Sequence, residues 1–225
     1  MNYFNQIGTL IRKDLTSELR TKEMLSSMLI FAMLTTVIFS FAFDPDTETV
    51  KKVFPGIIWV AFIFAGIMGL NRSFGGERNN DCILGLMLST TDRGVIYLGK
   101  TISNLVFMYI MEGITLPILF VLFDYRLKGP LLLLVTVVLL GTWGFIAVGT
   151  FMSAMAVNTR NSEILLPIIL FPLIVPVLIA AVQATGIIVN GGNWADAVNW
   201  FKIMGAFDVI FTVIPWLLFD YLLEV

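Results

Sequence analysis

Histidine is absent from this chain of 225 residues, and cysteine occurs only once, at Cys82. The absence of histidine removes the usual general base and the commonest metal ligand in proteins. A single cysteine excludes an internal disulfide bond, and a lone thiol is usually a small apolar residue. We therefore assign Cys82 no chemistry and expect no catalytic site and no metal site in this chain.

Motifs for catalysis and nucleotide binding are missing as well. The chain has no glycine-rich phosphate loop that ends in Lys-Ser or Lys-Thr, so it does not itself bind ATP through a P-loop. Serine-hydrolase, zinc-protease and Cys-x-x-Cys patterns are also absent. A net charge of −2 without a basic tract argues against nucleic acid as a partner. These absences predict a protein that is not an enzyme.

Charge is scarce, and long apolar runs take its place. Charged residues make up 13% of the chain and hydrophobic residues 58%, with a mean hydropathy of +0.91. Soluble proteins are about 25% charged, so this composition is typical of polytopic membrane proteins. We predict an all-α membrane protein with one domain over residues 1–225. Its six expected spans cover about 24–43, 53–71, 101–123, 130–155, 163–185 and 203–220.

The N-terminal arm, about residues 2–22, is too polar to span a membrane. Its apolar residues nevertheless recur at steps of three and four, at Phe4, Ile7, Ile11, Leu15 and Leu19. This spacing favours an amphipathic helix that lies in the membrane interface, with its cations toward the headgroups. The alternative is a basic flank that merely orients the first span.

A polar segment, residues 72–100, separates the second and third spans. It contains a short apolar cluster formed by Ile83, Leu84, Leu86, Met87 and Leu88. The pattern predicts a small amphipathic helix outside the bilayer, whose apolar face needs a cover. Lipid, the rest of this chain or a partner protein are the three candidates for that cover.

Lysine and arginine are distributed unevenly between the two sides of the predicted membrane domain. Nine of them lie in the N-terminal arm, in 72–100 and in 156–163, against five in the loops of the other side. Because loops rich in these residues stay in the cytoplasm, both termini and the 72–100 segment are expected to be cytoplasmic.

Two acids lie within predicted spans, where ionisable groups are costly and often functional. Glu112 lies near the middle of the third span. It is either a functional group, as a gate, a proton-linked site or a substrate contact, or a structural acid bonded to a neighbouring span. Asp208 is predicted to lie near one end of the sixth span, where an interfacial position is favoured. A carboxylate dyad for proteolysis is disfavoured because the two acids are on different spans.

Other features of the spans are structural. Small residues at four-residue spacing in the second span, Ala61, Ala65 and Gly69, predict a face that packs closely on another helix. The fifth span carries Pro167, Pro172 and Pro176, which predict a kinked or broken helix because each proline removes a backbone donor.

Several sequence blocks together resemble one family. They are Pro55-Gly56-Ile57-Ile58-Trp59-Val60-Ala61, Leu70-x-Arg72-x-Phe74, Leu84-x-Leu86-Met87-Leu88, Val95 through Lys100, and the proline-rich stretch from Leu165 to Pro176. With the six-span layout, they are similar to the CcmB family, the haem exporter B subunit of the cytochrome c maturation ABC transporter. Cys82 replaces a glycine that is frequent in the family, and Ser89-Thr90-Thr91 replaces a frequent proline.

The resemblance implies a permease subunit of the bacterial inner membrane with a separate cytoplasmic ATPase, which binds ATP and Mg²⁺. Further expected partners are a tryptophan-rich haem-handling membrane subunit, a small membrane subunit and more than one permease chain. The apolar cluster would be a coupling helix that docks into the ATPase. Glu77 and Asp81 would orient the docking by charge, while Ile83, Leu84, Met87 and Leu88 would fill a groove.

Haem binding is expected to belong to a partner subunit, since this chain has no histidine to hold the iron. This chain would then couple ATP hydrolysis to haem delivery, release or export. Two alternatives remain. One is a self-contained channel or proton-linked carrier organised on Glu112, and the other is a membrane scaffold without a transport role.

Overall fold

The computed structural model describes residues 3–43, 48–79, 93–156 and 162–222, without the side chains of 74–79, 162–163 and 220–222. All regular elements within these ranges are α-helices, as predicted. They are α1 (Tyr3–Thr21), α2 (Glu23–Ala42), α3 (Glu48–Asn79), α5 (Arg93–Leu122), α6 (Leu131–Ala156), α7 (Ser162–Val189) and α8 (Trp194–Leu222).

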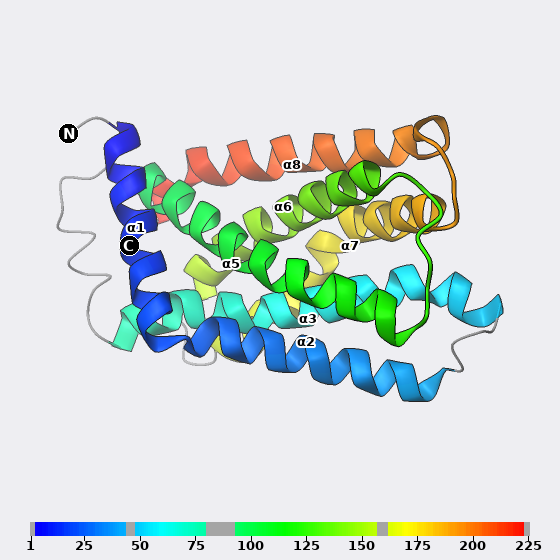
Figure 1. Ribbon diagram of the computed structural model, residues 1–225. Coiled ribbons are helices and arrows are strands. Elements are labelled where there is room, and N and C mark those ends of the chain that lie inside the picture. The colour runs from blue at the N-terminus through cyan, green and yellow to red at the C-terminus, as the bar shows by residue number, and fades with distance from the viewer. Residues whose placement is uncertain (1–2, 44–47, 80–92, 157–161, 223–225) are drawn as a thin grey trace.

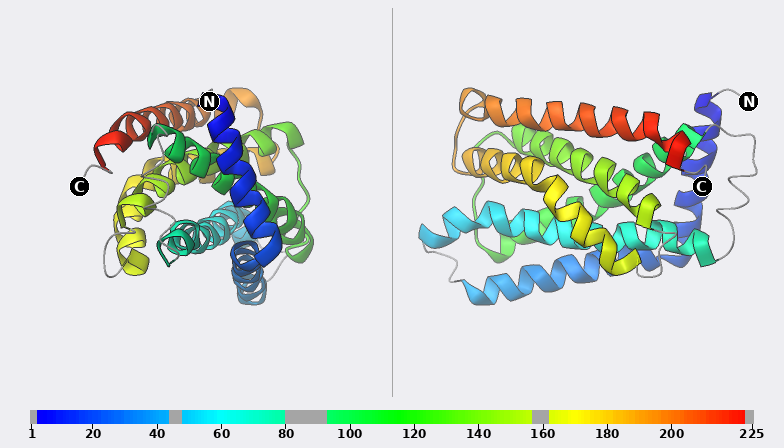
Figure 2. Two further views of the ribbon diagram at one scale, coloured as in Figure 1. Left: turned by 90° about the vertical axis from the view of Figure 1, so that its left-hand side faces the viewer. Right: turned by 180° about the vertical axis from the view of Figure 1, so that it is seen from behind.

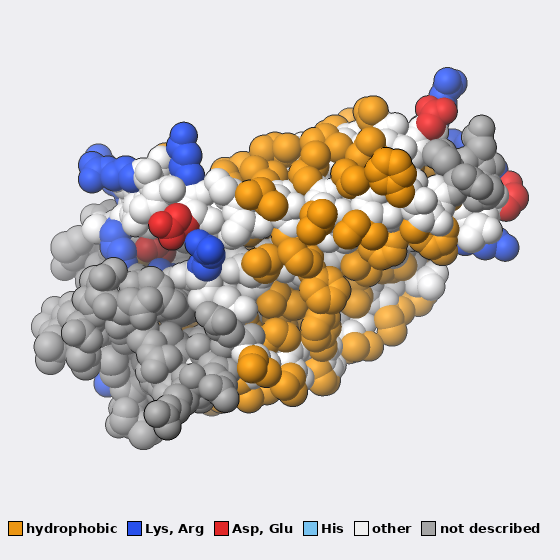
Figure 3. Space-filling model, turned by 90° about the horizontal axis from the view of Figure 1, so that it is seen from below, with side chains coloured by type: hydrophobic (Ala, Val, Ile, Leu, Met, Phe, Trp, Pro, Cys, Tyr) orange, Lys and Arg blue, Asp and Glu red, His pale blue; other side chains and the backbone are white. Residues whose placement is uncertain are grey.

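Six of these helices, α2, α3 and α5 to α8, are long and apolar enough to cross a membrane. They run side by side and alternate in direction along the chain (Figure 1). A band of hydrophobic side chains covers the middle of the face in Figure 3, and charged side chains gather at its two ends. A bundle with such a band is suited to lipid around its middle and water at its ends. The protein is therefore an integral membrane protein with six spans.

Helix α1 lies crosswise over one end of the bundle, which we call the α1 end (Figures 1 and 2). The first and last described helices both reach this end. The chain turns from α1 into α2 at Lys22, whose φ of 55° is left-handed. The Glu18 carboxylate accepts a hydrogen bond from the backbone N–H of Leu25 at 2.8 Å, which satisfies one of the free donors at the start of α2. The arm is thus a helix fixed to the bundle and more than a basic flank.

The face of α1 that packs on the bundle is rotated from the predicted stripe. Ile7 and Leu10 are buried, whereas Phe4 is 84% exposed and Leu19 is 69% exposed. The inward face instead includes two acids, Asp14 and Glu18, which are only partly exposed. Partners on other helices hold these acids, as described below, and such partners are invisible in the periodicity of a single helix.

Several helices extend beyond the predicted spans. The predicted 72–100 segment is helical over 72–79, where it continues α3, and over 93–100, where it begins α5. Helix α8 begins at Trp194 instead of about residue 203. Only a tight turn separates it from α7, because Gly191 adopts a φ of +96° and the N–H groups of Gly191 and Gly192 bond back to Ile188 and Ile187. This arrangement is a Schellman cap, which ends a helix within two residues.

The core depends on close approach between α6 and its neighbours. Glycines of α6 lie where large side chains of α3 are packed, Gly141 against Trp59 and Gly149 against Leu70. The Trp59 indole N–H also donates to Thr185 of α7 at 3.0 Å in a buried position. In lipid, helices associate through such close packing and through hydrogen bonds between them. Helix α6 is therefore the central element of the bundle.

Helix α7 runs through Pro167, Pro172 and Pro176 as one continuous helix. It bends along its length in Figure 2, where the yellow part is inclined to the orange part. Proline removes a backbone donor and presses on the preceding turn, so a bend at these positions has a known cause.

Candidate functional site

Lys100, in the second turn of α5, is buried at the α1 end. Its ammonium group lies 3.1 Å from a carboxylate oxygen of Asp14 on α1, and the two side chains are 4% and 11% exposed. The same ammonium donates to the backbone carbonyl of Ser73 on α3 at 3.3 Å. One side chain therefore connects three helices at the α1 end, and we call Asp14, Lys100 and the Ser73 carbonyl the α1 clamp.

Local sequence explains why α1 can approach α5 so closely. Gly99 precedes the lysine, and an ideal Cβ at that position would lie 3.1 Å from the Cβ of Leu10. A larger residue would push α1 outward, since cores are already packed near their density limit. On the neighbouring surface of α5, the Tyr97 hydroxyl lies 3.1 Å from the Ala147 carbonyl of α6 and 3.2 Å from the Phe211 carbonyl of α8. The first two turns of α5 are thus held on several sides.

Further polar contacts tie the other helices at this end. Arg72 on α3 lies 3.4 Å from the Glu23 carboxylate at the start of α2, in an exposed pair. The Trp216 indole N–H of α8 donates to the Tyr3 hydroxyl of α1 at 2.9 Å. Together with the α1 clamp and Glu18, these contacts join α1 to α2, α5 and α8 and reach α3.

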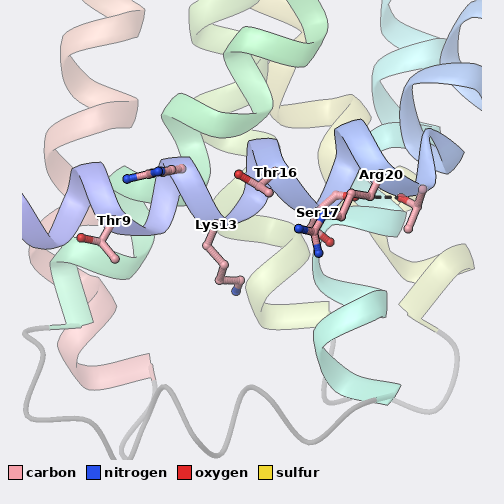
Figure 4. A pocket seen from close by; sticks show the side chains of 7 residues that line it. Thr9, Lys13, Thr16, Ser17 and Arg20 are labelled. Carbon is pink, nitrogen blue, oxygen red and sulfur yellow. Dashed lines mark hydrogen bonds between the residues drawn. The ribbon is translucent and has the colours of Figure 1, made fainter.

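The face of α1 directed away from the bundle is polar and basic (Figure 4). An open hollow runs along it, lined by Thr9, Arg12, Lys13, Thr16, Ser17, Arg20 and Thr21. In Figure 4 the Lys13 side chain points away from the bundle. Helix α1 therefore has an inner face that is bonded to the bundle and an outer face suited to water or anionic groups.

The predicted coupling residues lie largely beyond what the structure describes. Asp81, Ile83, Leu84, Met87 and Leu88 are outside the described residues. Glu77 belongs to the last turns of α3, but its side chain is also outside the described part. What the structure describes are the two helix ends that flank this segment, Asn79 of α3 and Arg93 of α5.

A second polar region lies in the middle of the bundle, on both sides of α6. Glu112 of α5 is 2% exposed and accepts a hydrogen bond from the Thr142 hydroxyl of α6 at 2.5 Å. Its other oxygen has no hydrogen-bond partner among the described residues. Glu112 is therefore bonded to a neighbouring span, as the structural alternative required, while half of its carboxyl group is left unsatisfied.

Asp208 of α8 is buried in the same layer, with an exposed fraction of 7%. Neither of its carboxyl oxygens has a hydrogen-bond partner in the described parts of the chain. One oxygen lies against Gly144 of α6, where a Cβ would collide with it. Because α8 starts at Trp194, Asp208 lies near the middle of the helix. The expectation of an interfacial position near one end is wrong, since the predicted span began too late.

The remaining predicted residues have structural positions. Ala61 and Ala65 are fully buried, and Gly69 faces Met24 and Met28 of α2. This face of α3 thus packs within the chain. Among the described residues, no three of the types His, Cys, Asp and Glu lie close enough together to hold a metal ion.

Sequence reasoning missed Asp14, Lys100, Thr142 and Gly144 as site residues. Lys100 was assigned to a polar loop because a charge usually marks the end of a span. A usable signal was its neighbourhood, since Val95, Ile96, Tyr97 and Gly99 form an apolar stretch just before it. Gly144 offered a further signal, because glycine leaves room for a side chain such as that of Asp208.

Comparison with known proteins gives one consistent result. The family model described as "CcmB protein" matches residues 5–219. A protein of Haemophilus influenzae named "Heme exporter protein B" is 26% identical over 191 residues, which cover 82% of this chain and 84% of that protein. Proteins of the same name from Pseudomonas aeruginosa and Escherichia coli K12 are each 25% identical, over 80% and 78% of this chain and 82% and 79% of theirs.

Proposed function

The chain belongs to the CcmB family, and from this premise we propose that it is the membrane permease subunit of an ABC transporter for cytochrome c maturation. A separate cytoplasmic ATPase hydrolyses ATP, and this chain transmits the resulting movement to its spans. The movement serves haem delivery, release or export. A haem-handling subunit holds the haem, because this chain has no histidine to bind the iron.

The observation that carries this proposal is the pair of helix ends at the α1 end. Helices α3 and α5 continue beyond the predicted spans to Asn79 and from Arg93, and the α1 clamp holds them together. Stiff helical ends transmit a displacement to the spans better than a flexible loop would. Of the coupling residues predicted from the sequence, Glu77 belongs to the last turns of α3, and the other five lie between these two ends.

The orientation follows from charge. The α1 end carries the larger share of lysine and arginine, including Arg12, Lys13 and Arg20 on the outer face of α1. In bacterial inner membranes such residues favour the cytoplasmic side. The α1 end therefore faces the cytoplasm, where the ATPase binds.

Replacing Leu84 and Leu88 by aspartate tests the docking of the ATPase. The expected result is that the variant inserts into the membrane but no longer co-purifies with the ATPase, because two charges cannot fill an apolar groove. The matched control is Leu84→Met with Leu88→Met, which keeps the apolar surface and should keep the complex. ATPase recovery that is equal for the aspartate variant and the control would contradict the proposal.

A second experiment separates energy coupling from a scaffold role. A variant ATPase that assembles but does not hydrolyse ATP is introduced into cells that carry this chain unchanged. The proposal predicts that holocytochrome c disappears although the complex can still be purified. Normal maturation with that ATPase would favour the scaffold.

A proton-linked carrier is a second candidate, and the buried acids favour it. Glu112 and Asp208 are both buried next to α6, and three of their four carboxyl oxygens have no partner among the described residues. Such groups inside a membrane protein often mark ion pathways. The carrier predicts flux in liposomes that contain this chain alone, and loss of that flux in Glu112→Gln. Flux that requires the ATPase would exclude it.

A further inference from the structure

The α1 clamp attaches a helix through a buried ion pair, and burying two charges costs a large desolvation free energy. Taking a lysine and an aspartate out of water costs about as much as their attraction returns, so an apolar pair would hold α1 equally well. What an ion pair adds is specificity of position. The ammonium of Lys100 must lie within reach of both the Asp14 carboxylate and the Ser73 carbonyl, at 3.1 and 3.3 Å.

This requirement fixes three elements relative to one another. Leu10 packs on Gly99 in the turn next to Lys100, so α1 cannot rotate without breaking the ion pair. Ser73 lies on α3 before its last turns, and Lys100 lies after the first turn of α5. The clamp therefore lies across the bases of the two helical ends on which the proposed coupling depends.

The other contacts of α1 show that the clamp is part of a larger brace. Glu18 caps the start of α2, and the Tyr3 hydroxyl accepts a hydrogen bond from Trp216 of α8. Both contacts lie on α1, on opposite sides of Asp14 along the helix. Helix α1 is thus attached near its two ends and at its centre, and the central attachment is the buried one.

We propose that Asp14, Lys100 and the Ser73 carbonyl make α1, α3 and α5 a single rigid unit at the α1 end, so that a movement imposed there by the ATPase reaches both spans together. This inference rests on the proposed function, because it needs an ATPase that acts at this end. Asp14 and Lys100 are positioning residues in this scheme. Helix α1 is a structural member of the coupling machinery in addition to a membrane-surface helix.

The test is Asp14→Asn, which keeps the shape of the side chain and removes the ion pair. The variant is expected to insert, to co-purify with the ATPase and to permit ATP hydrolysis. Holocytochrome c formation is expected to fall roughly fivefold or more, because coupling between two sites typically corresponds to a change of at least about fivefold. Asp14→Glu is the conservative control and should retain most of the maturation. Arg72→Ala, which breaks an exposed ion pair at the same end, should leave holocytochrome c formation unchanged.

A covalent link between α1 and α5 replaces the lost ion pair and tests whether rigid attachment at this end is what the variant lost. A Cβ at position 99 would lie 3.1 Å from the Cβ of Leu10, close to the separation of roughly 3.5–4.5 Å that a disulfide needs. Leu10→Cys and Gly99→Cys are combined with Cys82→Ser and Asp14→Asn. In the purified complex, oxidation should restore ATP-dependent haem release, and reduction should abolish it again.

The outcomes are separable. Absence of ATPase co-purification with the unaltered chain would remove the proposed function itself. An unaltered chain that couples, together with an Asp14→Asn variant that couples equally well, would overturn the clamp alone, as would failure of the oxidised disulfide to rescue. Should Asp14→Asn not insert, the neutral pair Asp14→Asn with Lys100→Met carries the test, and normal maturation with it would also overturn the clamp.

Discussion

At the α1 end of the bundle buried charges lie in a matched set, whereas in the middle of the bundle buried carboxyl groups lie largely unmatched. Lys100 and Asp14 form a close ion pair, and the Lys100 ammonium also donates a hydrogen bond to the Ser73 carbonyl of α3. Glu112 has one hydrogen bond, and Asp208 has none among the described residues. Both regions are well buried, so exposure to water does not explain the difference.

The difference indicates two kinds of task. A satisfied polar network in a low-dielectric environment rigidifies the elements that it joins. An unsatisfied buried carboxyl group lowers stability and persists where another requirement maintains it. The α1 end is thus built to stay together, whereas the middle contains buried carboxyl groups beside α6 that lower the stability of this arrangement. Single substitutions in the two regions test this contrast, because they should change the free energy of unfolding by different amounts and in different directions.

Lys100→Met gives the largest expected change. It removes the buried ammonium and leaves the Asp14 carboxylate with the half-exposed Lys13 ammonium at 3.5 Å, so the cost should lie toward the lower end of the about 3–5 kcal/mol that breaking a buried pair takes. The free energy of unfolding in mixed micelles should fall by this amount. The doubly neutral Asp14→Asn with Lys100→Met should lie close to the unaltered chain. Equal losses in the single and double variants would mean that the pair is not coupled.

The sequence contained the spans but not this network. Six spans are predictable because long charge-free stretches have few alternatives, and all six correspond to helices of the structure. Their ends are not predictable by the same rule, because it takes a charge beside an apolar run as the point where the chain leaves the membrane domain. Lys100 breaks the rule, since Asp14 from another helix neutralises it.

The same limit explains the rotation of α1 and the position of Asp208. Apolar periodicity identifies an amphipathic helix and puts Phe4 and Leu19 on its apolar stripe and Asp14 off it, but it does not show which face packs on the bundle. Lys100, which holds Asp14 against the bundle, lies 86 residues away in the chain, and no local pattern records such a partner. For Asp208, the turn at Gly191 and Gly192 was the available signal that α8 begins early, since paired glycines commonly end one helix shortly before the next.

Thr142→Val sharpens the contrast from the side of the membrane core. The substitution keeps the shape of the side chain and deletes the hydrogen bond to Glu112, so unfolding should become easier by about 1–2 kcal/mol. Thr136→Val on the same helix is the matched control, because the Thr136 hydroxyl donates to the Leu132 carbonyl of its own helix. If Thr142→Val lowers the free energy of unfolding no more than Thr136→Val does, the hydrogen bond to Glu112 contributes little to stability.

Asp208→Val should act in the opposite direction. It removes a buried group whose two oxygens have no partner among the described residues, so the bundle should become more stable by about 1 kcal/mol. On the same helix, Asp196 accepts a hydrogen bond from the Asn193 backbone N–H and completes a helix cap, so Asp196→Val should be destabilising. If Asp208→Val also destabilises, the carboxyl group has a partner in the membrane-embedded protein, and the two regions are alike.

Arg72→Ala gives the smallest effect, although it also breaks an ion pair at the α1 end. Arg72 and Glu23 are 49% and 73% exposed and lie 3.4 Å apart, so water and salt screen their attraction. Exposed pairs contribute about 0.2–1 kcal/mol, and the midpoint of thermal unfolding should barely move. Adding salt should erase even this change, whereas the effect of Lys100→Met should persist because the α1 clamp is buried. If Arg72→Ala instead lowers the midpoint of thermal unfolding strongly and at high salt, exposed ion pairs stabilise the α1 end as much as the buried Lys100 does.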